Sequence, residues 1–64
     1  MIKVSKKVFE GLEAVRYSAI TNMFDTNAVI HYARLLGYKE TVKWVSENKQ
    51  EYSQGLLSGF EAGS

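Results

Sequence analysis

The chain has 64 residues, which is enough for one small domain and too few for a second hydrophobic core. It contains no cysteine and a single histidine, His31, which excludes disulfides, zinc sites built on thiolates, and metal sites that need two histidines from one chain. Eight basic and seven acidic residues leave a net charge of +1, so the overall positive charge typical of nucleic-acid-binding proteins is absent and a nucleic-acid partner is not expected.

The small size of the chain predicts marginal stability, because a domain of this length buries only about 60% of its unfolded surface. Such domains usually gain stability from disulfides, a metal or a partner subunit, and the composition favours the partner subunit. A homodimer is therefore one expected arrangement.

No strongly apolar run is long enough to cross a bilayer, and Lys3, Lys6 and Lys7 lead into no signal-peptide core. The composition predicts a soluble protein of a reducing compartment with no membrane partner.

The first predicted helix begins after Ser5, which can cap it, and runs to about Tyr17. Apolar residues recur on one side of it at helical spacing, at Val8, Leu12 and Val15. Gly11 inside this helix costs roughly 1 kcal/mol relative to alanine, which is tolerable where a neighbouring element packs closely. Residues 2–4 alternate and could be extended, but they are too short to support a sheet alone, and residues 1–4 are expected to be frayed.

The second predicted helix carries the clearest start and stop signals, after a loop over residues 18–22. Asp25 is a good N-cap, and Phe24 before it can pack on Val29 as a hydrophobic staple. Gly37 suits the left-handed position after the last turn, which predicts a helix over residues 26–36. This helix is apolar on two sides, which indicates a second contact surface. One side carries Val29, Ile30, Ala33 and Leu36, and the other carries Ala28, Tyr32 and Leu35.

Helical spacing continues from Lys39 to the end of the chain, with a break favoured near Asn48 because asparagine prefers caps to helix interiors. The apolar residues that keep this spacing are Val42, Val45, Tyr52, Leu56 and Phe60. Residues 62–64 are expected to be frayed. The predicted fold is therefore all-α: one domain over residues 1–64, with three to four short helices forming a small bundle or packed helical hairpins, as a monomer or a homodimer.

No catalytic, cofactor or metal site is predicted. His31 falls on the side of its helix away from Val29 and Ala33, where an exposed polar residue is the simplest interpretation. Catalysis would need a positioned nucleophile or carboxylate beside it, and no recognisable motif supplies one. The sequence also lacks a glycine-rich phosphate loop and a serine-elbow motif. We therefore expect a protein that is not an enzyme.

Residues 33–44 can be interpreted as a helix-turn-helix or as a plain helical hairpin. Ala33 and Gly37 have the helix-turn-helix spacing, but the next core position would fall on Lys43, whereas the apolar Val42 comes one residue early. The segment also carries acidic residues among its few basic ones, which leaves few phosphate contacts. We favour the hairpin and keep a small DNA-binding regulator as the alternative.

Two sets of residues are candidates for protein contacts. Tyr32, Leu35, Tyr38 and Trp44 could form an exposed aromatic patch that binds a partner. The alternative is that Trp44 simply completes the core. Gly55 and Gly59, beside Leu56, could let another helix approach closely across a dimer axis. The alternative for these glycines is that they mark fraying of the last helix.

Several short motifs also follow one another in a recognisable order. They are Phe9-Glu10-Gly11, Glu13-Ala14-Val15-Arg16, Thr21-Asn22-Met23-Phe24-Asp25, Leu36-Gly37-Tyr38, Glu40-Thr41-Val42, Asn48-Lys49, Glu51-Tyr52 and Gly59-Phe60. This order, over residues 4 to 60, resembles a family of small proteins of unknown function from phages and prophages of Gram-positive bacteria.

The resemblance implies no catalytic residue. It implies a phage-encoded interaction protein in the cytoplasm of the bacterial host. Such a protein would bind a host or phage protein, and inhibit or modulate it by covering part of its surface. A third hypothesis is a structural piece of a phage particle.

Overall fold

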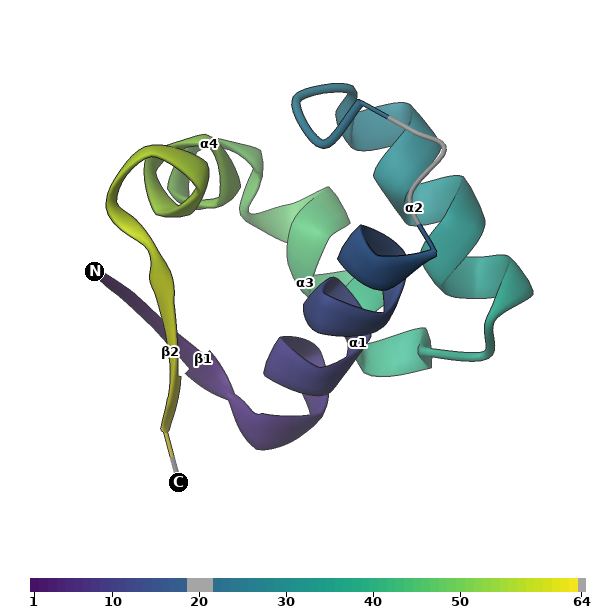
Figure 1. The fold of residues 1–64 in the computed structure, drawn as a ribbon, viewed down its shortest axis with the longest axis horizontal. Helices are drawn as coiled ribbons and strands as arrows, with labels where there is room; N and C mark the ends of the chain where they lie inside the picture. The colour runs from purple at the N-terminus through teal and green to yellow at the C-terminus, as the bar shows by residue number, and fades with distance from the viewer. Residues whose placement is uncertain (19–21, 64) are drawn as a thin grey trace.

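The computed structural model describes residues 1–18 and 22–63 (Figure 1). Along this part of the chain, a first short strand is followed by four helices and then by a second short strand. The order is β1 (Ile2–Ser5), α1 (Lys6–Tyr17), α2 (Thr26–Leu35), α3 (Lys39–Glu47), α4 (Lys49–Ser58) and β2 (Phe60–Gly63). The strands lie together on one side of the molecule and α2 on the opposite side, with α1 and α3 between them (Figure 1). Residues 19–21 of the predicted loop lie outside the described part.

The two strands correct the prediction of an all-α fold with frayed ends. β1 and β2 pair in parallel, with Ile2 opposite Phe60 and Val4 opposite Ala62. Residues 2–4 and 62–63 are thus ordered in a sheet, whereas Ser64 lies outside the described residues. The physical reason is that each strand pairs with a segment from the other end of the sequence and packs against the helices. Neither the pairing nor the packing can be predicted from the four residues of one strand.

The hydrophobic core draws on β1 and all four helices. Its buried apolar members are Val4, Val8, Leu12, Val15, Val29, Ala33, Val45 and Tyr52. The predicted apolar stripe of α1 is therefore confirmed, and so is the presence of three to four short helices in one small packed unit.

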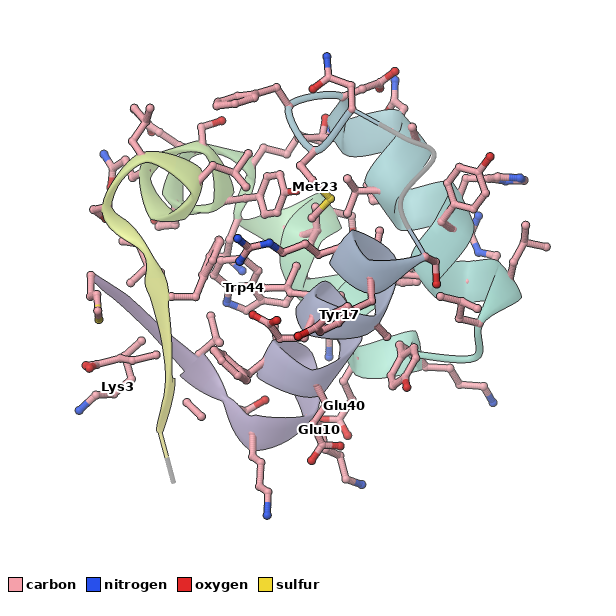
Figure 2. All side chains as sticks on the ribbon, viewed as in Figure 1. Lys3, Glu10, Tyr17, Met23, Glu40 and Trp44 are labelled. Atoms are coloured by element: carbon pink, nitrogen blue, oxygen red, sulfur yellow. The ribbon has the colours of Figure 1, made fainter. Side chains whose placement is uncertain are left out.

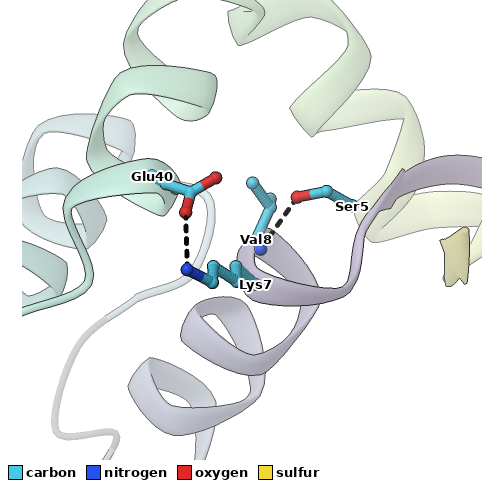
Figure 3. A network of polar contacts seen from close by, with 4 residues as sticks. All are labelled: Ser5, Lys7, Val8 and Glu40. Carbon is cyan, nitrogen blue, oxygen red and sulfur yellow. Dashed lines mark hydrogen bonds and ion pairs between the residues drawn. The ribbon is translucent and has the colours of Figure 1, made fainter. Parts of the chain in front are cut away.

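The predicted helix starts are confirmed by hydrogen bonds at their caps. The Val8 N–H donates to Ser5 Oγ at 3.2 Å (Figure 3), and the Ala28 N–H donates to Asp25 Oδ1 at 3.2 Å. These bonds satisfy N–H groups of the first turn that have no partner within the helix. Phe24, however, leaves 61% of its surface exposed, so most of its ring faces solvent instead of packing as a staple.

The predicted helix ends are also confirmed. Gly37 has φ +88°, the left-handed conformation that glycine adopts without strain, and α2 ends within one residue of the expected position. Asn48 separates α3 from α4 with φ −135°, and its Nδ2 donates to the Trp44 carbonyl at 3.0 Å. The side-chain bond satisfies a carbonyl in the last turn of α3, which is why the break falls at this asparagine.

Gly11 marks the closest approach of α1 to α3. Thr41 is fully buried opposite it and donates from Oγ1 to the Val8 carbonyl at 3.2 Å. A Cβ atom on residue 11 would overlap Thr41 Oγ1 and would lie 2.7 Å from Thr41 Cβ. The condition under which Gly11 is tolerable, a neighbouring element that packs closely against it, is therefore met.

Candidate interaction surfaces

Trp44 belongs to the edge of the core. Its ring is half-buried and meets the ring of Phe60 edge-to-face, with the ring centroids 6.1 Å apart. Figure 2 shows it in the interior of the view, between β2 and α1. Phe60 comes from the strand that the sequence did not predict, so the partner that holds Trp44 was not foreseen. The surroundings of Trp44 agree better with the alternative that it helps to complete the core than with a place in an exposed patch.

We expect Trp44→Ala to lower the free energy of unfolding by about 2 kcal/mol, less than for a fully buried aromatic residue, because part of the ring stays in solvent. Chemical denaturation followed by far-UV circular dichroism measures this change. Trp44→Phe is the matched variant and should lose clearly less, because it keeps a ring against Phe60. If Trp44→Ala is as stable as the parent chain, Trp44 does not contribute to the core.

The other three residues of the predicted patch lie together near the turn between α2 and α3. We define the α2–α3 corner as Tyr32, Leu35, Leu36 and Tyr38. Leu35 and Leu36 leave 67% and 45% of their surfaces exposed, and both tyrosines are half-buried. No atom lies within 4 Å of where a Cβ on Gly37 would stand, so the surface around the turn is open. Tyr32, Leu35, Leu36 and Tyr38 thus belong to the last turn of α2 and the connection to α3, whereas Trp44 lies at the edge of the core.

The α2–α3 pair has the features of a helical hairpin. Residues 36–38 connect the two helices, and the Tyr38 N–H donates to the Ala33 carbonyl at 2.9 Å. Lys43, where a helix-turn-helix needs a buried residue, is exposed, whereas Val42 is half-buried against the core. Glu40 on α3 forms an exposed ion pair with Lys7 of α1 at 3.5 Å (Figure 3), which places negative charge on the helix that would read DNA.

The two glycines proposed for a dimer contact have roles within the chain. Gly55 is buried, and a Cβ atom there would overlap the ring of Phe60, so Phe60 occupies the space that a second helix would need. Gly59 has φ +99° and ends α4, with its N–H donating to the Gly55 carbonyl at 2.6 Å. The space directly over Gly55 is therefore taken by a side chain of the same chain, and the dimer contact through the two glycines stays a prediction. Leu56 beside it is half-buried and lines a groove.

That groove lies between α1 and the segment formed by α4 and the start of β2, and it encloses about 420 Å³. Its lining is formed by Phe9, Leu12, Glu13, Arg16, Met23, Gly55, Leu56, Gly59 and Phe60. The contributions of α1 recur at i, i+3, i+4 and i+7, which is one face of a helix. The sequence did not predict this groove, because its two walls are about 40 residues apart in the chain. The only local signal was Phe9 next to the apolar stripe of α1.

The rim of the groove carries one charge of each sign. Arg16 Nη1 lies 3.9 Å from Glu13 Oε1, and both side chains remain accessible to solvent. An exposed pair at this distance contributes little to stability, so both groups are free to form other ion pairs at low cost.

Residues 22–24, directly before α2, form hydrogen bonds at one end of the groove. The Phe24 N–H donates to Asn22 Oδ1 at 2.9 Å, and the Tyr52 hydroxyl donates to the Met23 carbonyl at 2.6 Å. Met23 points from this loop into the molecule, where it lines the groove (Figure 2). Burial raises the pKa of Tyr52 to about 12, which keeps the hydroxyl protonated and able to donate to Met23.

Comparison with known proteins places these features in a family. Residues 4–60 match the family described as Domain of unknown function (DUF5049). The chain belongs to this family. No curated protein and no solved structure matches it. The match extends from Val4 in β1 to Phe60 in β2, so the α2–α3 corner and the groove both lie within the DUF5049 region.

Within the described residues of this DUF5049 domain, no group of three or more histidine, cysteine, aspartate or glutamate side chains is arranged to hold a metal ion. His31 is exposed, and its ring meets that of Tyr32 edge-to-face at 5.5 Å. A second hollow of about 270 Å³ lies between α1 and the turn into α3, and its lining includes Glu10 and Glu40, which Figure 2 labels. None of the described helices combines the length and the apolar content needed to cross a bilayer.

Proposed function

We propose that this DUF5049 chain is a phage- or prophage-encoded protein-binding module. In the cytoplasm of a Gram-positive host it would bind one host protein and inhibit or modulate it by covering part of its surface. The observation that carries the proposal is the α2–α3 corner, where Leu35 and Leu36 stand exposed beside two half-buried tyrosines. The resemblance to phage and prophage proteins supplies the biological setting.

The corner has the composition of a protein contact. Large apolar side chains gain about 25 cal/mol for each Å² that a partner removes from water, and Leu35 and Leu36 both expose such surface at the end of α2. Tyr32 and Tyr38 add aromatic area with few rotatable bonds, which is typical of residues that contribute most to binding. Arg34 and Lys39, within and directly after this segment, are exposed and can form the polar rim of such a contact.

The size of the module and the chemistry of the corner support a proposal of inhibition by covering a surface. The molecule measures about 24 × 21 × 21 Å, which is enough to present one standard interface of about 800 Å² per partner. The corner offers side chains for contact and no base paired with a nucleophile. A bound module would therefore act through the area that it occupies on its partner.

The proposal is tested by affinity capture with matched variants. The tagged parent chain, the double variant Leu35→Ser/Leu36→Ser, and Phe24→Ala are each incubated with lysates of uninfected and phage-infected Gram-positive cells. We expect the parent chain and Phe24→Ala to retain one host protein in stoichiometric amount. The corner variant should lose it, with an affinity for the purified partner at least ~30-fold weaker. Phe24 is the matched control because it is an exposed apolar residue before the opposite end of α2.

Three results would contradict the proposal. The first is that neither lysate yields a partner, and the second is that the corner variant keeps the partner at full affinity. The third is that the parent chain binds random duplex DNA at low salt and loses it steeply as salt rises, which would favour the DNA-binding alternative.

A further inference from the structure

We propose that the groove between α1 and α4 binds a second copy of this chain, with Phe24 of each copy inserted into the groove of the other. This surface differs from the α2–α3 corner, so the inference stands independently of the proposed partner. It also differs from a contact through Gly55 and Gly59, because the inserted group is an aromatic ring and the receiving surface is built mainly from larger side chains.

Phe24 has the properties of an inserted group. Its side chain is 61% exposed, although the residues around it are held in place. Asn22 Oδ1 accepts from its own N–H, the Tyr52 hydroxyl holds the carbonyl of Met23, and Asp25 caps α2 directly after it. A ring presented on a fixed backbone loses little conformational entropy when it is buried by a partner, which favours binding.

The groove has the properties of a receiving pocket. Leu12 and Gly55 are buried at its base, and Phe9, Met23, Leu56 and Phe60 are half-buried around it. The volume of about 420 Å³ is large enough for an aromatic side chain and for part of the loop that carries it. Aromatic and methionine side chains adjust to an inserted ring and make favourable contacts with it.

A second copy is favoured as the occupant because the donor and the receiver of the ring are neighbours in the chain. Met23 lines the groove and Phe24 is the next residue, so a two-fold axis beside this loop would place each ring in the other copy's groove. The rim is self-complementary, since the same axis lets Arg16 of one copy approach Glu13 of the other. The net charge of +1 opposes this association only weakly.

The apolar surface extends beyond the groove in a way that suits an interface. Tyr17 and Leu57 are highly exposed, and they directly follow the groove residues Arg16 and Leu56 in the sequence. Self-association would also supply the support that a small chain without disulfides needs.

Sedimentation equilibrium from micromolar to millimolar protein concentration tests the proposal. We expect the parent chain to form a dimer, and Phe24→Ala to raise its dissociation constant at least ~30-fold, the effect of losing a hot-spot side chain. Leu35→Ser is the matched control, because Leu35 is equally exposed but lies in the α2–α3 corner, and it should leave the dissociation constant unchanged. Thermal melts confirm that each variant is folded.

A complementation experiment tests the reciprocal insertion. Leu56→Glu places a charge in the groove, so it should weaken the homodimer as Phe24→Ala does. A mixture of the two variants keeps one intact ring and one intact groove, and it should form a heterodimer tighter than either homodimer.

A parent chain that is monomeric throughout, or a Phe24→Ala dimer with the parent dissociation constant, would overturn the proposal. The proposal would also be overturned if a mixture of folded Phe24→Ala and folded Leu56→Glu associates no more tightly than either variant alone. If Leu56→Glu does not fold, the comparison of Phe24→Ala with Leu35→Ser decides.

Discussion

Replacing Gly11 with leucine is expected to lower the free energy of unfolding by about 3 kcal/mol, the largest loss that we anticipate for one substitution in this chain. The new side chain would collide with Thr41, which is fully buried and β-branched and therefore has no free rotamer to adopt. Separating α1 from α3 would also break the hydrogen bond from Thr41 Oγ1 to the Val8 carbonyl. Urea denaturation followed by circular dichroism measures the loss.

Glu10→Leu is the control for this substitution. It adds the same side chain one residue earlier on α1, at an exposed position, so it should change the stability by less than about 0.5 kcal/mol. A variant Gly11→Leu that is as stable as Glu10→Leu would show that α1 and α3 do not approach as closely as described here.

Raising the pH from 10 to 12 is expected to remove about 2 to 3 kcal/mol of stability through Tyr52 alone. Burial raises the pKa of this hydroxyl from 10.0 to about 12, so the unfolded chain loses the proton at a lower pH than the folded chain does. The contribution of the neutral hydroxyl is therefore fully present below pH 10 and is lost as the pH rises through the pKa of the folded state. Stability measured by urea denaturation at a series of pH values should fall over this window.

Tyr52→Phe separates this effect from the titration of the other tyrosines and of the lysines. Without the hydroxyl, the Met23 carbonyl loses its donor, and we expect a cost of about 1 kcal/mol at neutral pH. The loss between pH 10 and 12 should then be smaller than in the parent chain by about 2 to 3 kcal/mol. Equal pH profiles for the two proteins would contradict the assignment to Tyr52.

The helices could be predicted because their boundaries depend on local chemistry. Asp25 caps α2 with its own carboxylate, Gly37 supplies a backbone conformation that other residues rarely adopt, and Asn48 interrupts the last helical stretch. Each of these signals involves residues no more than four positions apart. The packing at Gly11 depends instead on a distant element, because the glycine indicated only that a close neighbour would make it tolerable, and that neighbour is Thr41 on α3.

The strands and the groove could not be predicted, because both depend on contacts between distant parts of the chain. Val4 becomes a buried strand residue only when residues 60–63 lie beside it. The position of Phe60 then determines the surroundings of Trp44 and Gly55, since both lie against its ring. The sequence left two alternatives open for each of these residues, because the strand that brings Phe60 to them was not predicted.

The pairing of β1 with β2 also sets an order of events during synthesis. β1 is synthesised before the four described helices, and its partner strand follows only after all four of them. Because synthesis proceeds at roughly 5 to 20 residues per second, the partner strand is made several seconds after Val4, while the helices form and begin to pack. Because the sheet closes a loop that contains nearly the whole chain, its formation carries the largest entropic cost of any contact in the fold. We therefore expect the sheet to form last, on helices that are already assembled.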